Sequence, residues 1–115
     1  MNPLLKNGIN LFNQAKFFDA HETWEEYWNT LESPEKEYFQ GVIQCSVALH
    51  LIEEDRLVGA KKVWQRAQNN FEDAPKQVQG IDLEDLKTQM VKIFNDLGGF
   101  SPSNVRISQV NRPTS

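Results

Sequence analysis

The sequence predicts an all-α protein, a compact single-domain bundle of about five helices. Apolar residues recur at spacings of three and four along most of the chain. No segment shows the alternation of apolar and polar residues that is typical of a half-buried strand. Residues that cap or end helices divide the chain into segments of helical length. With 115 residues, of which 39% are hydrophobic, the chain has the size and composition of one globular domain.

The first two helices are predicted over roughly residues 3–15 and from Asp19 onward. Asn2 is a suitable N-cap, and Pro3 suits the first helical position because its missing N–H has no partner there. Asp19 and Glu22 have the spacing of a capping box, which predicts the start of the second helix. The first helix would bury a stripe formed by Leu4, Leu5, Ile9, Leu11 and Phe12.

The third helix is predicted to begin at Ser33, as the N-cap, with Pro34 in its first turn, and to reach Ile52. From Tyr38 onward this segment is apolar nearly all round. A helix that is apolar on every side belongs in the middle of a bundle. We therefore expect this helix to be packed on several sides.

Two further helices and a tail complete the prediction. The fourth helix covers roughly residues 56–73, and the fifth starts at Asp82 and ends at Gly98. The bundle domain is expected over residues 1–100. The polar residues 101–115 are expected to form a mobile tail. We find no internal repeat of fixed period.

One polar cluster stands out on the second helix. His21, Trp24, Glu25 and Trp28 share a helix face, and the aromatic residues predict that this face is buried. A buried carboxylate must be paired because its isolated burial is very costly. The next helix presents polar partners at matching spacing, so the expected pocket includes Glu22, Gln40, Gln44 and His50 as well.

Three interpretations of this cluster remain open. It is a polar network that fixes helix packing, or His21, Glu25 and His50 bind a divalent metal such as Zn, Mn or Fe, or His21 or Glu25 acts as a general acid or base. The spacing favours the network over the metal and the metal over metal-free catalysis. The chain has only two histidines, and Cys45 lies well round the helix from His50, so metal ligands are few.

Two sequence blocks resemble a known family. Phe18-Asp19-Ala20-His21-Glu22-x-Trp24-Glu25-x-x-Trp28, with the later block at residues 39–50, is similar to domain of unknown function number 309. The hallmark of that family is HxxxExxW, met here by His21, Glu25 and Trp28. The resemblance covers roughly residues 8–72. It implies a compact helical fold and a metal-binding role for the motif residues, and it names no substrate.

Charge and hydropathy limit the classes of partner. The net charge is −4 and the pI about 5.1, which argues against nucleic acid and anionic membranes as partners. No apolar run approaches the ~20 residues of a membrane span, and the polar N-terminus is not a signal peptide, so we expect a cytoplasmic protein. The lone cysteine excludes an internal disulfide.

Two functional hypotheses follow. In the first, His21 and Glu25 form a divalent-metal or small-ligand site between the second and third helices. In the alternative, the chain is a non-enzymatic, oligomeric interaction module in which the polar cluster is structural. Whether the protein is an enzyme is left open by the sequence.

Overall fold

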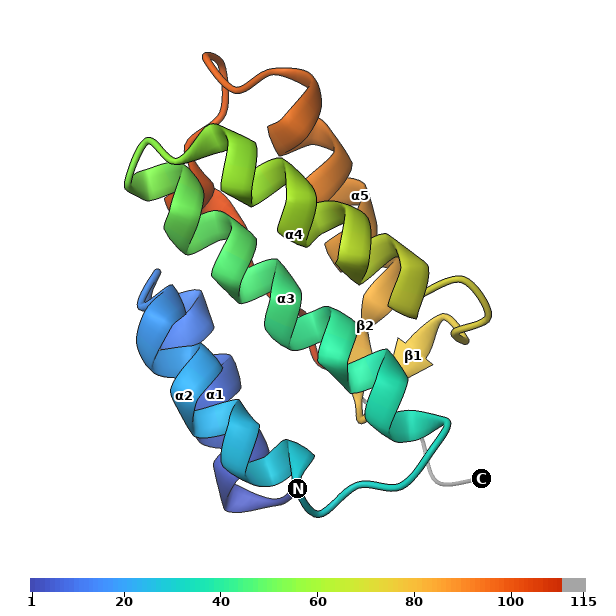
Figure 1. The fold of residues 1–115 in the computed structure, drawn as a ribbon. Helices are drawn as coiled ribbons and strands as arrows, with labels where there is room; N and C mark the ends of the chain where they lie inside the picture. Colours follow the sequence, from blue (N-terminus) through green and yellow to red (C-terminus); the bar gives the residue numbers. More distant parts are fainter. Residues whose placement is uncertain (111–115) are drawn as a thin grey trace.

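The computed structural model describes residues 1–110; the last part of the predicted tail, 111–115, lies outside the described residues. The all-α prediction is confirmed, with one small exception (Figure 1). A two-stranded antiparallel hairpin follows the fourth helix, where no strand was expected. The elements are α1 (Pro3–Asn13), α2 (Phe17–Trp28), α3 (Glu35–Glu53), α4 (Leu57–Asn70), β1 (Gln77–Val78), β2 (Ile81–Asp82), α5 (Leu83–Asn95) and the 3₁₀ turn η1 (Pro102–Asn104).

Two of the predicted helix starts are confirmed by their caps. The Asn2 side chain accepts hydrogen bonds from the backbone N–H groups of Leu4 at 2.8 Å and Leu5 at 3.3 Å. The Asp82 side chain accepts from the backbone N–H of Asp85 at 3.0 Å. Each cap satisfies N–H groups that the first helical turn leaves without a partner.

The other two capping predictions are wrong. Helix α2 already begins at Phe17, after Lys16, so Asp19 lies inside its first turn instead of capping it. Helix α3 has Pro34 at its N-cap position with no side-chain cap, and Ser33 donates to the carboxylate of Glu37 instead. In both cases the chain enters the helix from a turn that fixes the start without a side-chain cap.

The backbone repeats a helical hairpin although the sequence shows no fixed period. In the loop after α1, Ala15 has a φ of 61°, and in the loop after α3, Asp55 has a φ of 60°. Lys16, which follows Ala15, donates its backbone N–H to the carbonyl of Leu11 at 2.9 Å. Arg56, which follows Asp55, donates its backbone N–H to the carbonyl of Leu51, also at 2.9 Å. The α1–α2 and α3–α4 pairs are therefore two copies of one supersecondary unit.

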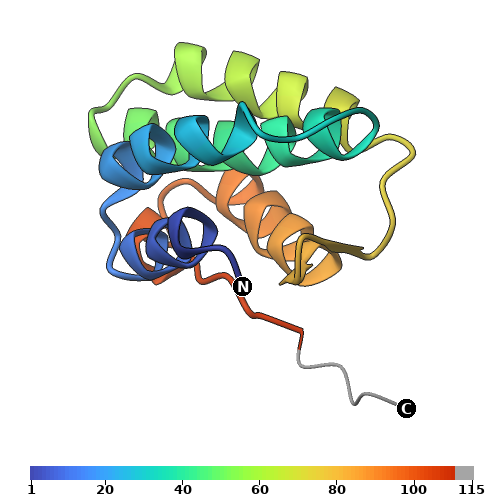
Figure 2. The same cartoon turned by 90° about the horizontal axis from the view of Figure 1, so that it is seen from below.

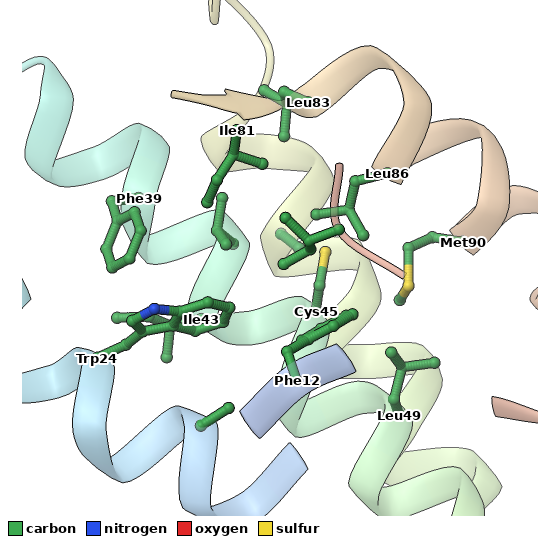
Figure 3. Packing of buried hydrophobic residues seen from close by; sticks show 14 of the residues in the cluster. Phe12, Trp24, Phe39, Ile43, Cys45, Leu49, Ile81, Leu83, Leu86 and Met90 are labelled. Atoms are coloured by element: carbon green, nitrogen blue, oxygen red, sulfur yellow. The ribbon is translucent and has the colours of Figure 1, made fainter. Parts of the chain in front are cut away.

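Helix α3 lies in the middle of the molecule, as its apolar sequence predicts. It packs against α2 on one side and α4 on the other (Figure 1). Helices α1 and α5 lie together on one side of the layer formed by α2, α3 and α4 (Figure 2). The core between them contains fully buried Trp24, Phe12, Phe39, Leu86 and Met90 (Figure 3).

The chain after α5 returns to this core. Val105 and Ile107 are 2% and 4% exposed, and Gln109 forms an antiparallel bridge with Ile81 of β2. The sequence predicted a mobile tail from residue 101, whereas the structure places residues 101–110 against the bundle. The cause is a short alternation in which Val105 and Ile107 face inward while Arg106 faces solvent.

Candidate functional site

The predicted His21–Glu25 pair forms on α2. Nε2 of His21 lies 2.7 Å from Oε1 of Glu25, one helical turn away. The prediction that this pair is buried is wrong for the carboxylate, because the Glu25 side chain is 59% exposed and that of His21 is 24% exposed. The buried stripe of α2 is Phe17, Ala20, Trp24 and Tyr27. His21 and Glu25 each follow a stripe residue and so lie at the edge of the buried face.

Both predicted tryptophans serve packing. The buried Trp24 Nε1 donates to the backbone carbonyl of Leu5 at 3.1 Å, which ties α2 to α1. Trp28 Nε1 donates to the carbonyl of Lys36 at 2.8 Å, and the Lys36 ammonium lies 4.2 Å from the centre of the indole ring. Each indole N–H is therefore satisfied by backbone oxygen, as buried indoles require.

The polar residues of α3 do not converge on His21 and Glu25 as predicted. Gln44 accepts a hydrogen bond from Asn70 of α4 at 2.8 Å, so its amide joins α3 to α4 instead. Gln40 is half-buried on α3, and Glu22 is exposed on α2. In the part of the chain that the structure describes, neither of them is hydrogen-bonded to His21.

His50 forms a second pair of the same kind on α3. Its Nε2 lies 3.4 Å from Oε1 of Glu54, again one helical turn away. Arg56 Nη1 lies 3.9 Å from the same carboxylate oxygen. Burial raises the pKa of the nearby Glu53 carboxyl, an effect that the charge of His50 opposes. One end of α3 thus gathers an imidazole, a guanidinium and two carboxylates.

The structure brings both histidines to one groove. The ring of Phe18 contacts both of them, with its centre 5.8 Å from that of His21 and 5.4 Å from that of His50. Both imidazoles therefore contact the same phenyl ring. The groove, which we call the Phe18 groove, has a volume of about 250 Å³ and is lined by Phe18, His21, Val47, His50, Leu51 and Arg56.

Sequence reasoning missed Phe18 and Arg56 as groove residues. Phe18 lies one turn before His21 on the same helix face, which is a signal that was available. Arg56 lies in the loop between α3 and α4, and its place beside His50 depends on the tight turn there. His21 Nδ1 is buried and has no hydrogen-bond partner among the described residues. That nitrogen keeps an unused capacity to donate or accept.

The described residues contain no group of three or more His, Cys, Asp or Glu side chains that could hold a metal ion. The His21–Glu25 pair supplies only two donors. Cys45 is fully buried in the core, and this burial raises the pKa of its thiol far above the ordinary value. It is therefore remote from metal chemistry at the surface. Over the same residues, no helix has the length and apolar character that a bilayer crossing requires.

Comparison with known proteins gives two findings. A family model described as "Domain of unknown function (DUF309)" matches residues 5–63, a range that includes every residue of the Phe18 groove. An uncharacterized protein of Aquifex aeolicus (strain VF5) is 28% identical over 92 residues, or 79% of this chain. The chain spans only 28% of the length of that relative.

Proposed function

Since this chain belongs to the DUF309 family, whose description assigns no activity, we propose its function from its own geometry: it binds a small anionic ligand in the Phe18 groove. The observation that carries the proposal is that both histidines of the chain, from different helices, line one groove around a half-exposed phenyl ring. Two imidazoles beside an aromatic ring offer polar groups next to apolar surface, which is the usual composition of a ligand site.

The lining residues indicate the class of ligand. Phe18, Val47 and Leu51 provide apolar surface, while Arg56 offers a planar guanidinium that suits a carboxylate or phosphate. A volume of about 250 Å³ lies below that of most drug-sized pockets, so the ligand has few heavy atoms. A short-chain carboxylate or a small organic phosphate fits this description. The proposal assigns binding and no reaction.

The test is a titration followed by NMR of the imidazole C–H groups, which two histidines make simple to assign. Acetate, butyrate, inorganic phosphate and phenyl phosphate are the probes. We expect at least one probe to shift the signals of His21 and His50 together and saturably. Arg56→Gln should weaken this binding about tenfold or more, because a hydrogen bond to a charged group contributes about 1.5–3 kcal/mol.

Matched controls are available on the same molecule. Phe18 and Phe100 are both 48% exposed, and Phe100 lies outside the groove, so Phe18→Ala should weaken binding and Phe100→Ala should not. Arg66→Gln on the exposed face of α4 is the control for Arg56→Gln. The proposal fails if none of the probes shifts either imidazole, or if the Phe18 and Phe100 variants bind equally.

A second candidate is divalent-metal binding by the His21–Glu25 pair alone; the predicted third ligand, His50, pairs with Glu54 instead and forms no three-residue metal group with them among the described residues. It is supported by the 2.7 Å distance between the imidazole and the carboxylate, which lie one helical turn apart. Zn, Mn and Fe are the ions that suit such donors. Calorimetric titration with Zn²⁺ and Mn²⁺ tests it, with Glu25→Gln against Glu26→Gln as the control on α2. A flat titration of the wild-type protein would remove this candidate.

The alternative of an oligomeric interaction module has its own support. Leu57 and Val58, in the first turn of α4, are 37% and 72% exposed, so this hairpin end presents apolar surface. The test is sedimentation, which measures the mass of the wild-type chain and of the Val58→Asp variant in solution. The wild-type chain should form an oligomer that Val58→Asp weakens. A monomer at all concentrations would argue against it.

A further inference from the structure

Residues 105–110 lie across α1, α5 and β2, and hydrogen bonds to their backbone hold them there. We propose that the surface they cover docks an extended segment of a partner protein with β-branched apolar residues at alternate positions, and that residues 105–110 fill it in cis. We call the surface the C-terminal seat; it is formed by Asn13 of α1, Gln89 of α5, and Gly80 and Asp82 at β2. It is separate from the Phe18 groove and independent of the function proposed there.

Two side-chain amides hold the backbone of the segment. Asn13 donates to the carbonyl of Ile107 at 3.0 Å and accepts from the N–H of the same residue at 2.7 Å. Gln89 donates to the carbonyl of Arg106 at 2.7 Å and accepts from its N–H at 2.9 Å. Consecutive residues are therefore each bound in a two-bond ring, one by α1 and the next by α5. These four bonds select backbone conformation and not side-chain identity.

The bound segment continues as an added strand. The N–H of Asp82 donates to the carbonyl of Ser108 at 2.8 Å, and the N–H of Val110 donates to the carbonyl of Gly80 at 2.8 Å. This antiparallel pairing with β2 is the bond pattern by which sheet edges bind peptides. Six hydrogen bonds are thus made to backbone N–H and C=O groups of residues 106–110.

The side chains of the segment show what the partner must offer. Val105 and Ile107 enter the core, whereas Arg106, Ser108 and Gln109 are exposed. The seat therefore accepts two apolar residues separated by any one residue. β-Branched residues suit these positions because they favour an extended backbone.

The connection to α5 allows the segment to leave as a unit. Helix α5 ends at Asn95, and Gly98, Gly99 and Phe100 of the connection are exposed. A cavity of about 80 Å³ lies between α5 and the start of the segment, next to Phe100 and Val105. Release of residues 105–110 breaks no α-helix, but it removes Val105 and Ile107 from the core and breaks the bond from the Val105 N–H to the Pro102 carbonyl in η1. It would expose the amides of Asn13 and Gln89 for a second peptide.

Competition in the full-length chain is the direct test. The probe is a fluorescent peptide with the sequence of residues 101–110, and the control is the same peptide with Ile107→Asp. The tethered segment competes at millimolar effective concentration, so the wild-type chain should bind the probe weakly. Full-length Ile107→Asp, whose own segment is disabled, should bind it at least tenfold more tightly. Adding Asn13→Ala should abolish that gain, whereas Asn10→Ala should not.

Hydrogen exchange of the wild-type chain provides a second measurement, because Ile107→Asp can also unfold the protein. If the segment opens locally, the amides of Arg106 and Ile107 exchange at least tenfold faster than those of Val42 and Leu49 in α3. Exchange of all four amides at one rate would show that the segment leaves only on global unfolding and would overturn the proposal. A wild-type dimer in which each copy places its residues 105–110 in the C-terminal seat of the other would overturn the proposal of a partner protein, since a second copy of the chain would then fill the seat.

Discussion

The indole of Trp24 lies directly against the backbone of Gly8. A Cβ atom placed on Gly8 would be 2.0 Å from Nε1 of Trp24, far inside any van der Waals contact. The same Nε1 donates to the carbonyl of Leu5, one turn earlier on α1. The α1–α2 packing that presents His21 to the Phe18 groove therefore depends on a missing side chain at one position.

Gly8→Ala should destabilise the protein even though alanine favours a helix by about 1 kcal/mol over glycine. Overpacking of a close contact typically costs about 1–3 kcal/mol, and here it also displaces a hydrogen-bonded indole. Gly59→Ala on α4 is the matched control, because its Cβ would meet only Leu51 at 3.6 Å. We expect urea unfolding to show a loss for Gly8→Ala and a gain for Gly59→Ala. A gain for both would refute the close contact.

Glu25→Gln should change the free energy of unfolding by less than about 1 kcal/mol. Its carboxylate is 59% exposed, and exposed ion pairs contribute about 0–1 kcal/mol. A buried pair would instead cost about 3–5 kcal/mol when one partner is removed. Urea unfolding of Glu25→Gln beside Glu26→Gln measures the difference. A loss of several kcal/mol for Glu25 alone would restore the buried site that the sequence suggested.

The predicted features that proved correct depend on local sequence. The caps at Asn2 and Asp82 need only a few neighbouring residues, and the central place of α3 follows from its own apolar surface. The predicted convergence of Gln44 with His21 does not occur, because it depends on how α2 and α3 are rotated about their own axes. That rotation is set by tertiary packing of the α2 stripe, and it turns Gln44 toward Asn70.

The C-terminal segment could not be found by periodicity. Only Val105 and Ile107 alternate inward, which is too short for a strand signal. The amide that holds Ile107 comes from Asn13, near the other end of the chain, and a single asparagine on a helix carries no signal for such a contact. The position of the segment is therefore a property of the assembled fold.

Cys45 should react with a thiol reagent only when the protein unfolds. The side chain is fully buried, and burial raises the pKa of its thiol because the thiolate loses its hydration. Native protein mixed with an aromatic disulfide reagent at pH 8 should label no faster than it unfolds. The rate in increasing urea should follow the unfolded fraction. Rapid labelling without urea would mean that the core around α3 opens locally.

The Tyr27 hydroxyl should make stability fall at alkaline pH. It donates to Gln79 at 2.6 Å, and Gln79 donates to Glu35 at 3.0 Å. Burial, and then the charge of Glu35, raise the pKa of Tyr27 above its ordinary value of 10.0. Above pH 10 the unfolded chain therefore loses this proton before the folded chain does, and stability decreases as pH rises through the folded pKa. Tyr27→Phe should lower the free energy of unfolding by about 1 kcal/mol at pH 7, because one hydrogen bond is lost.

Urea unfolding from pH 8 to 11 measures the alkaline effect. Stability should decline less for Tyr27→Phe than for wild type, and Tyr38→Phe is the control for loss of a phenol elsewhere. Parallel declines for wild type and Tyr27→Phe would show that Tyr27 is not the titrating group.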